Sequence, residues 1–229
     1  MVQVPRRPAF ADSALARLLA RWSDTEVRAP AASTAERLSQ WLAWTDAIAL
    51  STVLNAPAAR AKAVAGSQED ECARVREGLA KTIREDCLYA SVNDDATATT
   101  TIDFAPYRLR YLARQQAMEA GVAPLRAKLR GTLAARSSEM AKLATVDAVM
   151  EQALQARSHA LLASVPAMLE TRFKGLRQMA VPAQDAPETD AAPSAWLPVF
   201  HQDIRDLLLA ELDFRFQPID GLLEALRSH

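Results

Sequence analysis

The sequence of 229 residues is poor in the residues that build cofactor sites, disulfide frameworks and sheets. It contains 6 Gly, 3 His and 2 Cys, and aromatic residues make up only 6% of it. Two cysteines are too few for a disulfide framework, and a zinc site needs four ligands. We therefore interpret Cys72 and Cys87 as reduced thiols of a cytosolic protein.

Motifs for phosphate and metal binding are missing as well. Phosphate-binding loops need glycine-rich turns ahead of a helix, but neither G-x-x-x-x-G-K nor G-x-G-x-x-G occurs. The metal-binding patterns H-E-x-x-H, E-x-x-H and paired C-x-x-C do not occur either. These absences argue against a nucleotide-dependent or metal-dependent enzyme, and we expect no cofactor and no bound metal.

The three histidines do not suggest catalysis. An acid–base pair must lie within hydrogen-bond reach. His159 has no Asp or Glu four residues away, and His229 is the last residue of the sequence. His201 and Asp203 are two residues apart, a spacing that puts them on different faces of a helix. We interpret all three as ordinary surface histidines and predict no catalytic residue and no enzymatic activity.

Long apolar runs are also absent. No window of ~18 consecutive apolar residues occurs, so we expect no transmembrane helix. The first ten residues, MVQVPRRPAF, include a charged pair but no apolar run after it, so we expect no secretory signal. The sequence predicts a cytoplasmic protein.

Helical periodicity is the strongest positive signal, and it extends from Tyr107 to Met179. Steps of three, four or seven residues between large apolar side chains keep them on one face of an α-helix. Gly121, Pro124 and Pro166, the last with Ser164 as a new cap, are expected to divide the stretch into two or three helices. A compact domain would fold them as a long central antiparallel pair. The apolar series is Tyr111, Met118, Val122, Leu125, Leu129, Leu133, Met140, Leu143, Val146, Met150, Leu154, Leu161, Val165, Leu169, Phe173 and Leu176.

The remaining sequence predicts further helices and four segments. Residues 1–66 form an N-terminal helical part, with one helix from a cap at Asp12 to Trp22 and another ending near Leu54. Trp41 and Trp44 are interpreted as core anchors of the second helix. Residues 67–180 hold an acidic helix over 67–90, a loop and the central helices. The expected apolar face of the second helix is Leu38, Trp41, Leu42, Thr45, Ile48, Ala49 and Thr52.

Residues 181–195 and 196–229 complete the chain. The segment 181–195 has three prolines, small residues and acids, and predicts a flexible acidic linker. Residues 196–229 are strongly apolar and predict a tethered helical pair whose second helix starts at Pro218. The pair is expected to dock, either on the central helices or on a partner subunit. The acids expected to face the basic residues of 108–136 are Asp203, Asp206, Glu211 and Asp213.

Charge is segregated along the chain although the net charge is only −1. Counted from the sequence, residues 1–67 carry +3, 68–103 carry −5, 104–181 carry +7 and 182–229 carry −6. A basic centre between acidic segments indicates internal docking or separate partners. On a helical wheel the basic residues lie on both sides of the apolar stripe, as they do on a packed helix. The basic residues of the centre are Arg108, Arg110, Arg114, Arg126, Lys128, Arg130 and Arg136.

Several strings resemble a known family. They are ADSALARLL, WLAWTDAIALSTVLN, PYRLRYLARQQAM, PLRAKLR, LATVDAVM, VPAMLETRF and LLLAELDFRFQPIDGLLEAL. Together they resemble an uncharacterised bacterial family that is classed as a domain of unknown function. The resemblance implies genes near proton-channel subunits of the flagellar-stator and TolQ/ExbB type and near OmpA-like proteins. It would make the chain a cytoplasmic accessory of an envelope complex, and it carries no functional residues.

The sequence therefore predicts an all-α, multi-helix bundle that is a non-enzymatic interaction or scaffold protein. A protein partner or self-association is expected, without direct insertion into a membrane. The alternative is a nucleic-acid-binding helical protein, in which the basic central helices contact phosphates and Tyr107 and Tyr111 stack on bases.

Overall fold

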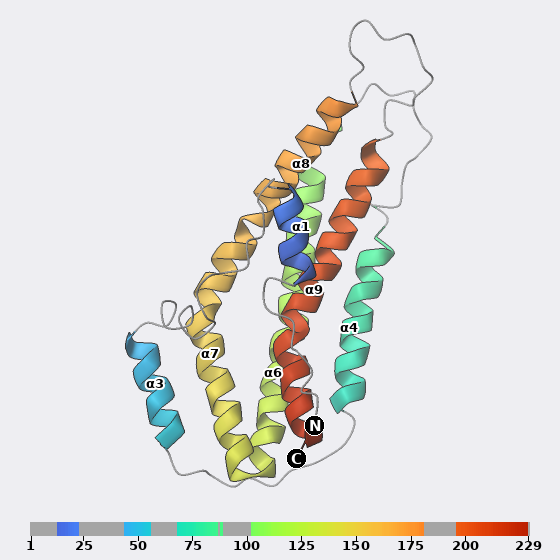
Figure 1. The fold of residues 1–229 in the computed structure, drawn as a ribbon. Helices are drawn as coiled ribbons and strands as arrows, with labels where there is room; N and C mark the ends of the chain where they lie inside the picture. Colours follow the sequence, from blue (N-terminus) through green and yellow to red (C-terminus); the bar gives the residue numbers. More distant parts are fainter. Residues whose placement is uncertain are drawn as a thin grey trace, which may run out of the picture. The chain divides into compact units, whose positions relative to one another are not determined.

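The chain is an all-α helical bundle, shown as a computed structural model in Figure 1. The structure describes residues 13–22, 44–55, 68–86, 88, 102–180 and 196–228, and these residues contain no strand. The proposed cap at Asp12, Trp41, Cys87 and the predicted linker 181–195 lie outside the described residues. The helices are α1 (Ala14–Trp22), α3 (Trp44–Asn55), α4 (Gln68–Arg84), α6 (Ala105–Arg136), α7 (Ser138–Ala163), α8 (Val165–Met179) and α9 (Trp196–Ser228).

These helices form two compact units, and each unit consists of three segments that are separate in the sequence. Unit 1 comprises Met1–Arg28, Gly78–Ala117 and Ser164–Phe214, and unit 2 comprises Ala29–Glu77, Met118–Ala163 and Arg215–His229. Helices α4, α6 and α9 are each divided between the two units, with one part in each. The four segments predicted from the sequence are not tested by this division and stay a prediction.

The central stretch forms three helices, as the sequence predicts, but only one of the expected breaks occurs. Ser164 precedes α8, and Pro166 lies in its first turn, where a missing N–H costs little. Gly121 and Pro124 do not interrupt α6, which continues through both. The break before α7 falls instead at Ser137.

Local chemistry explains both outcomes. The Ser137 hydroxyl accepts a hydrogen bond from the Met140 backbone N–H at 3.2 Å, which caps the start of α7. A proline inside a helix removes one backbone hydrogen bond. Burial of Leu125, directly after Pro124, and of Leu129, five residues after it, offsets that loss, because each buried apolar side chain contributes about 1.5–3 kcal/mol.

The core of unit 1 is an aromatic cluster at the start of α6 and α9 and in the middle of α8. The Phe200 ring lies 5.3 Å from that of Tyr107 and 5.0 Å from that of Phe173, measured between centroids. Trp196 adds a further edge contact to Phe173 at 5.0 Å. Such tilted and edge-on arrangements are favourable because the edge of one ring meets the negative face of another. Helix α1 packs against α8 in the same unit, with Leu15 buried.

Unit 2 contains the α6–α7 hairpin. The second part of α6 and α7 run side by side and are joined at Ser137 (Figure 1). Helix α3 packs on α7, and the first part of α4 and the last part of α9 complete the unit. Its fully buried large side chains include Met118, Leu129 and Leu133 of α6.

Helix α9 corrects the prediction for the C-terminal segment. Pro218 does not start a new helix, since α9 is continuous from Trp196 to Ser228. Phe216 and Ile219 on either side of the proline are 1% and 0% exposed. Pro218 removes one backbone hydrogen bond from the helix, and the burial of these two side chains offsets that loss. The segment is thus a single long helix.

Candidate interaction surface

Most of the predicted basic series is paired within the chain. In unit 1, Asp86 is buried and accepts two hydrogen bonds from Arg114, at 2.6 and 3.0 Å. Arg110 lies 3.7 Å from the same carboxylate. Asp86 belongs to the acidic segment 68–103, so this contact joins two segments of opposite charge. Internal docking, one of the two alternatives, therefore describes this part of the basic series.

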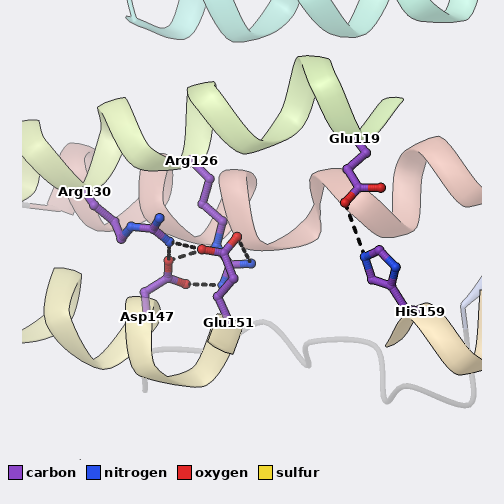
Figure 2. A network of polar contacts seen from close by, with 6 residues as sticks. All are labelled: Glu119, Arg126, Arg130, Asp147, Glu151 and His159. Atoms are coloured by element: carbon purple, nitrogen blue, oxygen red, sulfur yellow. Dashed lines mark hydrogen bonds and ion pairs between the residues drawn. The ribbon is translucent and has the colours of Figure 1, made fainter. Parts of the chain in front are cut away.

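A denser network joins α6 to α7 in unit 2. Figure 2 shows Arg126 and Arg130 reaching from α6 toward Asp147 and Glu151 of α7. Arg126 contacts Asp147 at 2.7 Å and Glu151 at 3.2 Å, and Arg130 contacts the same two acids at 3.1 and 2.6 Å. Each acid thus accepts from both arginines. Burial lowers the pKa of Arg130, but hydrogen bonds to Glu151 and Asp147 outweigh it and raise the pKa.

One more contact fixes the direction of the two helices. Glu119, earlier in α6, pairs at 3.2 Å with His159, later in α7 (Figure 2). Residues earlier in α6 thus contact residues later in α7, so these two helices run antiparallel within unit 2. His159 is an exposed histidine, but its acidic partner comes from another helix and could not be found from local spacing.

The remaining members of the series are also largely engaged. Lys128 pairs with Glu71 of α4, and Arg136 donates to the backbone carbonyl of Leu226 in α9. Six of the seven basic residues thus have a partner among the described residues, and Arg108 is an exposed position.

We expect the α6–α7 network to contribute measurably to stability. The Arg126 and Asp147 side chains are only 14% and 15% exposed, so solvent screens them weakly. A double-mutant cycle with Arg126→Ala and Asp147→Ala should give a coupling energy of about 1–2 kcal/mol in urea unfolding. The exposed pair Lys174–Glu170 in α8 is the control, with an expected coupling of about 0.3–0.5 kcal/mol. Equal coupling energies for the two pairs would contradict the expectation.

Unit 1 buries two polar contacts that the sequence did not reveal. His201 is 1% exposed and lies 3.0 Å from the Tyr107 hydroxyl, so its interpretation as a surface histidine is wrong. It occupies the face of α9 that packs against the aromatic cluster. Burial raises the pKa of the Tyr107 hydroxyl. Glu211 is 0% exposed and accepts hydrogen bonds from Tyr111 at 2.5 Å and from Gln115 at 3.1 Å.

Three of the four acids of the C-terminal segment contact groups other than the basic residues that the sequence predicted for them. Glu211 faces α6, where a tyrosine and a glutamine, Tyr111 and Gln115, donate to it. Asp203 pairs with Arg172 of α8 at 2.8 Å, outside the range 108–136. Asp206 accepts from Gln202 of its own helix. Both tyrosines proposed for base stacking are buried, with Tyr107 7% and Tyr111 0% exposed.

Within the described ranges, no group of three or more His, Cys, Asp or Glu side chains is placed to hold a metal ion. Cys72 is a free, buried thiol of α4, and burial is the largest cause that raises its pKa. Across the same residues no helix is long and apolar enough to cross a membrane.

Helix α3 presents the largest departure from the expected core. Its half-buried residues are Asp46, Ala49, Leu50 and Val53, which share one face. Trp44 is 81% exposed, and Ile48 and Leu54 are 51% and 58% exposed. Trp44 is therefore not a core anchor, and the predicted apolar face was wrong at Thr45, Ile48 and Thr52, which are exposed. The reason is that nearly all of α3 is apolar or small, so its periodicity does not distinguish the two faces.

A family model matches the chain over residues 1–228. The matching family is described as "Protein of unknown function (DUF3348)". The chain belongs to the DUF3348 family. The match confirms the resemblance to a domain of unknown function over almost the whole chain, but it says nothing of gene neighbours. No curated protein and no solved structure matches the chain.

Proposed function

We propose that this DUF3348 protein is a non-enzymatic interaction protein that binds a protein partner through the exposed face of α3. The supporting observation is the exposure of three large apolar side chains, Trp44, Ile48 and Leu54, on one short helix. Grouped exposed apolar side chains usually mark a surface that another molecule covers. Trp is also enriched at the energetic centres of protein interfaces.

The alternative of nucleic-acid binding has less support. Binding to phosphates needs basic side chains that can exchange small counterions for the nucleic acid. Arg110, Arg114, Arg126, Lys128 and Arg130 are instead held by carboxylates of the same chain. Releasing them would cost their ion pairs and leave buried acids such as Asp86 without their partners.

Fluorescence polarisation with labelled DNA and RNA tests this alternative. At physiological salt we expect no binding, because the basic side chains are already neutralised within the chain. A salt-sensitive rise in polarisation that is lost in a triple variant with R126A, K128A and R130A would reverse the ranking of the two functions. Circular dichroism of the variant must first show that it keeps its helices.

Site-specific photo-cross-linking in cells of the native host tests the proposed function. In one variant of the chain a photoreactive amino acid replaces Ile48, and in a second variant it replaces Leu109. Leu109 is 69% exposed and lies on α6 in unit 1, so it is a matched control. We expect a protein adduct from position 48 and none from position 109. No adduct at position 48, or equal adducts at both positions, would contradict the proposal.

The cellular setting is a separate matter. A role as a cytoplasmic accessory of a membrane-embedded complex rests on the family resemblance alone and stays a prediction. Isolation of the adduct from position 48 followed by mass spectrometry would identify the complex directly, if one is involved.

A further inference from the structure

The contact between α3 and α7 buries little of α3. None of the residues of α3 is buried, whereas every other helix that the structure describes has at least one buried side chain. The side that packs on α7 carries the half-buried residues Asp46, Ala49, Leu50 and Val53. Among these four, the large apolar side chains are those of Leu50 and Val53. The apolar contact that fixes α3 to unit 2 is therefore small.

The helix depends on this small contact for its shape. It has 12 residues, and isolated helices shorter than about 12–15 residues are marginal in water because the first turn is costly to form. Side chains that branch at Cβ lower the propensity for helix further. Docking on α7 and the helical state of α3 are therefore lost together. The β-branched residues of α3 are Thr45, Ile48, Thr52 and Val53.

The α6–α7 hairpin that carries α3 is held more firmly. Leu129 and Leu133 of α6 and Met140 of α7 are buried, and the ion pair of Arg126 with Asp147 joins the two helices. Elements with few buried apolar contacts open at a lower free energy than the rest of a structure. We therefore expect α3 to open while the hairpin stays folded.

The composition of α3 suits a second state in which more of its surface is covered. A helix that is apolar all round is normally buried all round. Asp46 is the one charged residue of α3, yet the helix packs on α7 by one side and leaves Trp44 and Leu54 exposed. A partner that encloses a short apolar helix in a groove would cover both sides.

We propose that α3 is a releasable helix, which leaves α7 as a unit and is then enclosed by an apolar groove of the protein partner. The inference rests on the proposed function and adds its regulation, because α7 and the partner compete for the side that carries Leu50 and Val53. Docking on α7 lowers the apparent affinity for the partner by the fraction of chains in which α3 is released. Asp46 lies in the first turn of α3, so the groove must present hydrogen-bond donors at that end.

Hydrogen–deuterium exchange of the purified full chain tests the release. Amides of α3 should exchange about 10–1,000-fold more slowly than in a free peptide of residues 44–55, and at least about 100-fold faster than those of residues 129–133 in α6. Low concentrations of urea should leave the α3 rates almost unchanged, because local release exposes little surface, whereas the α6 rates should rise. Equal rates in α3 and α6, or α3 rates equal to those of the free peptide, would overturn the release.

Two alanine variants compare the docked side of α3 with its exposed side. L50A shortens a half-buried side chain and should raise the exchange rate of α3 about tenfold. I48A shortens a side chain that is 51% exposed and should leave the rate unchanged or lower it, since alanine favours helix. If L50A exchanges like I48A, docking on α7 does not hold the helix.

Cross-linking at position 50 separates this inference from the proposed function. An aliphatic diazirine side chain at this position keeps about the size of leucine. We expect the adduct with the partner at position 50 as well as at position 48. If position 48 gives this adduct and position 50 does not, the partner does not enclose α3, and the interaction function stands without the release. If neither position gives an adduct, both proposals are wrong.

Discussion

A chain that ends at Pro187, before α9, is expected to lose its cooperative fold. Seven large side chains of α9 are 0–1% exposed, and each contributes about 1.5–3 kcal/mol through burial. Their sum, roughly 10–20 kcal/mol, equals or exceeds the total stability of about 5–15 kcal/mol of an ordinary protein. The side chains are Phe200, Ile204, Leu207, Leu208, Leu212, Phe216 and Ile219.

Thermal unfolding monitored by circular dichroism, together with size-exclusion chromatography, measures this effect. The shortened chain should show no sigmoidal transition, or should aggregate through the uncovered faces of α6 and α8. A chain shortened only by Ser228 and His229 is the control and should melt like the full protein. A chain ending at Pro187 that stays monomeric and melts at the same temperature would show that α9 is dispensable.

Replacing Phe200 with alanine is expected to cost about 3–5 kcal/mol in the free energy of unfolding. Phe200 is 0% exposed, and its ring contacts those of Tyr107 and Phe173 at the centre of the aromatic cluster. The substitution leaves a cavity that the surrounding rings cannot fill without losing their tilted arrangement. Urea unfolding, followed by far-ultraviolet circular dichroism, measures the loss.

The neighbouring residue gives a matched control for this substitution. Val199 lies one position earlier in α9 and is 47% exposed. Val199→Ala should change the stability by no more than about 0.5 kcal/mol, as is usual for surface positions. If the two variants lose the same stability, the aromatic cluster is not the core of unit 1.

The helical class and most of the core could be predicted from the sequence because they depend on local periodicity. The central series spaces Met118, Leu125, Leu129 and Leu133 so that they share one face of α6, and all four are buried. Charge segregation likewise indicated pairing within the chain, which Asp86 with Arg114 and Glu71 with Lys128 display.

Features that depend on distant residues could not be predicted in the same way. The burial of Glu211 and His201 follows from Tyr111 and Tyr107, about a hundred positions earlier in the sequence. The near neighbours of His201 suggested a surface position, and Glu211 was expected to face arginines rather than a tyrosine. The continuity of α6 and α9 through their prolines depends on burial that local propensity does not include.

The exposed face of α3 was missed for a different reason. In a helix with one polar face, the apolar face is the buried one. Helix α3 has a single charged residue, Asp46, and that residue lies on the half-buried face toward α7. With apolar and small residues on all sides, only the packing in three dimensions determines which side faces solvent.

The most direct measurement of how this chain folds is hydrogen–deuterium exchange of the full protein, read by mass spectrometry. If the C-terminal segment docks on its own chain, amides of α9 between Phe200 and Leu222 should exchange as slowly as those of α6, over hours rather than seconds. If α9 exchanges within seconds while α6 stays protected, the helix does not dock on its own chain, and the pairing of charged and apolar segments described above is wrong.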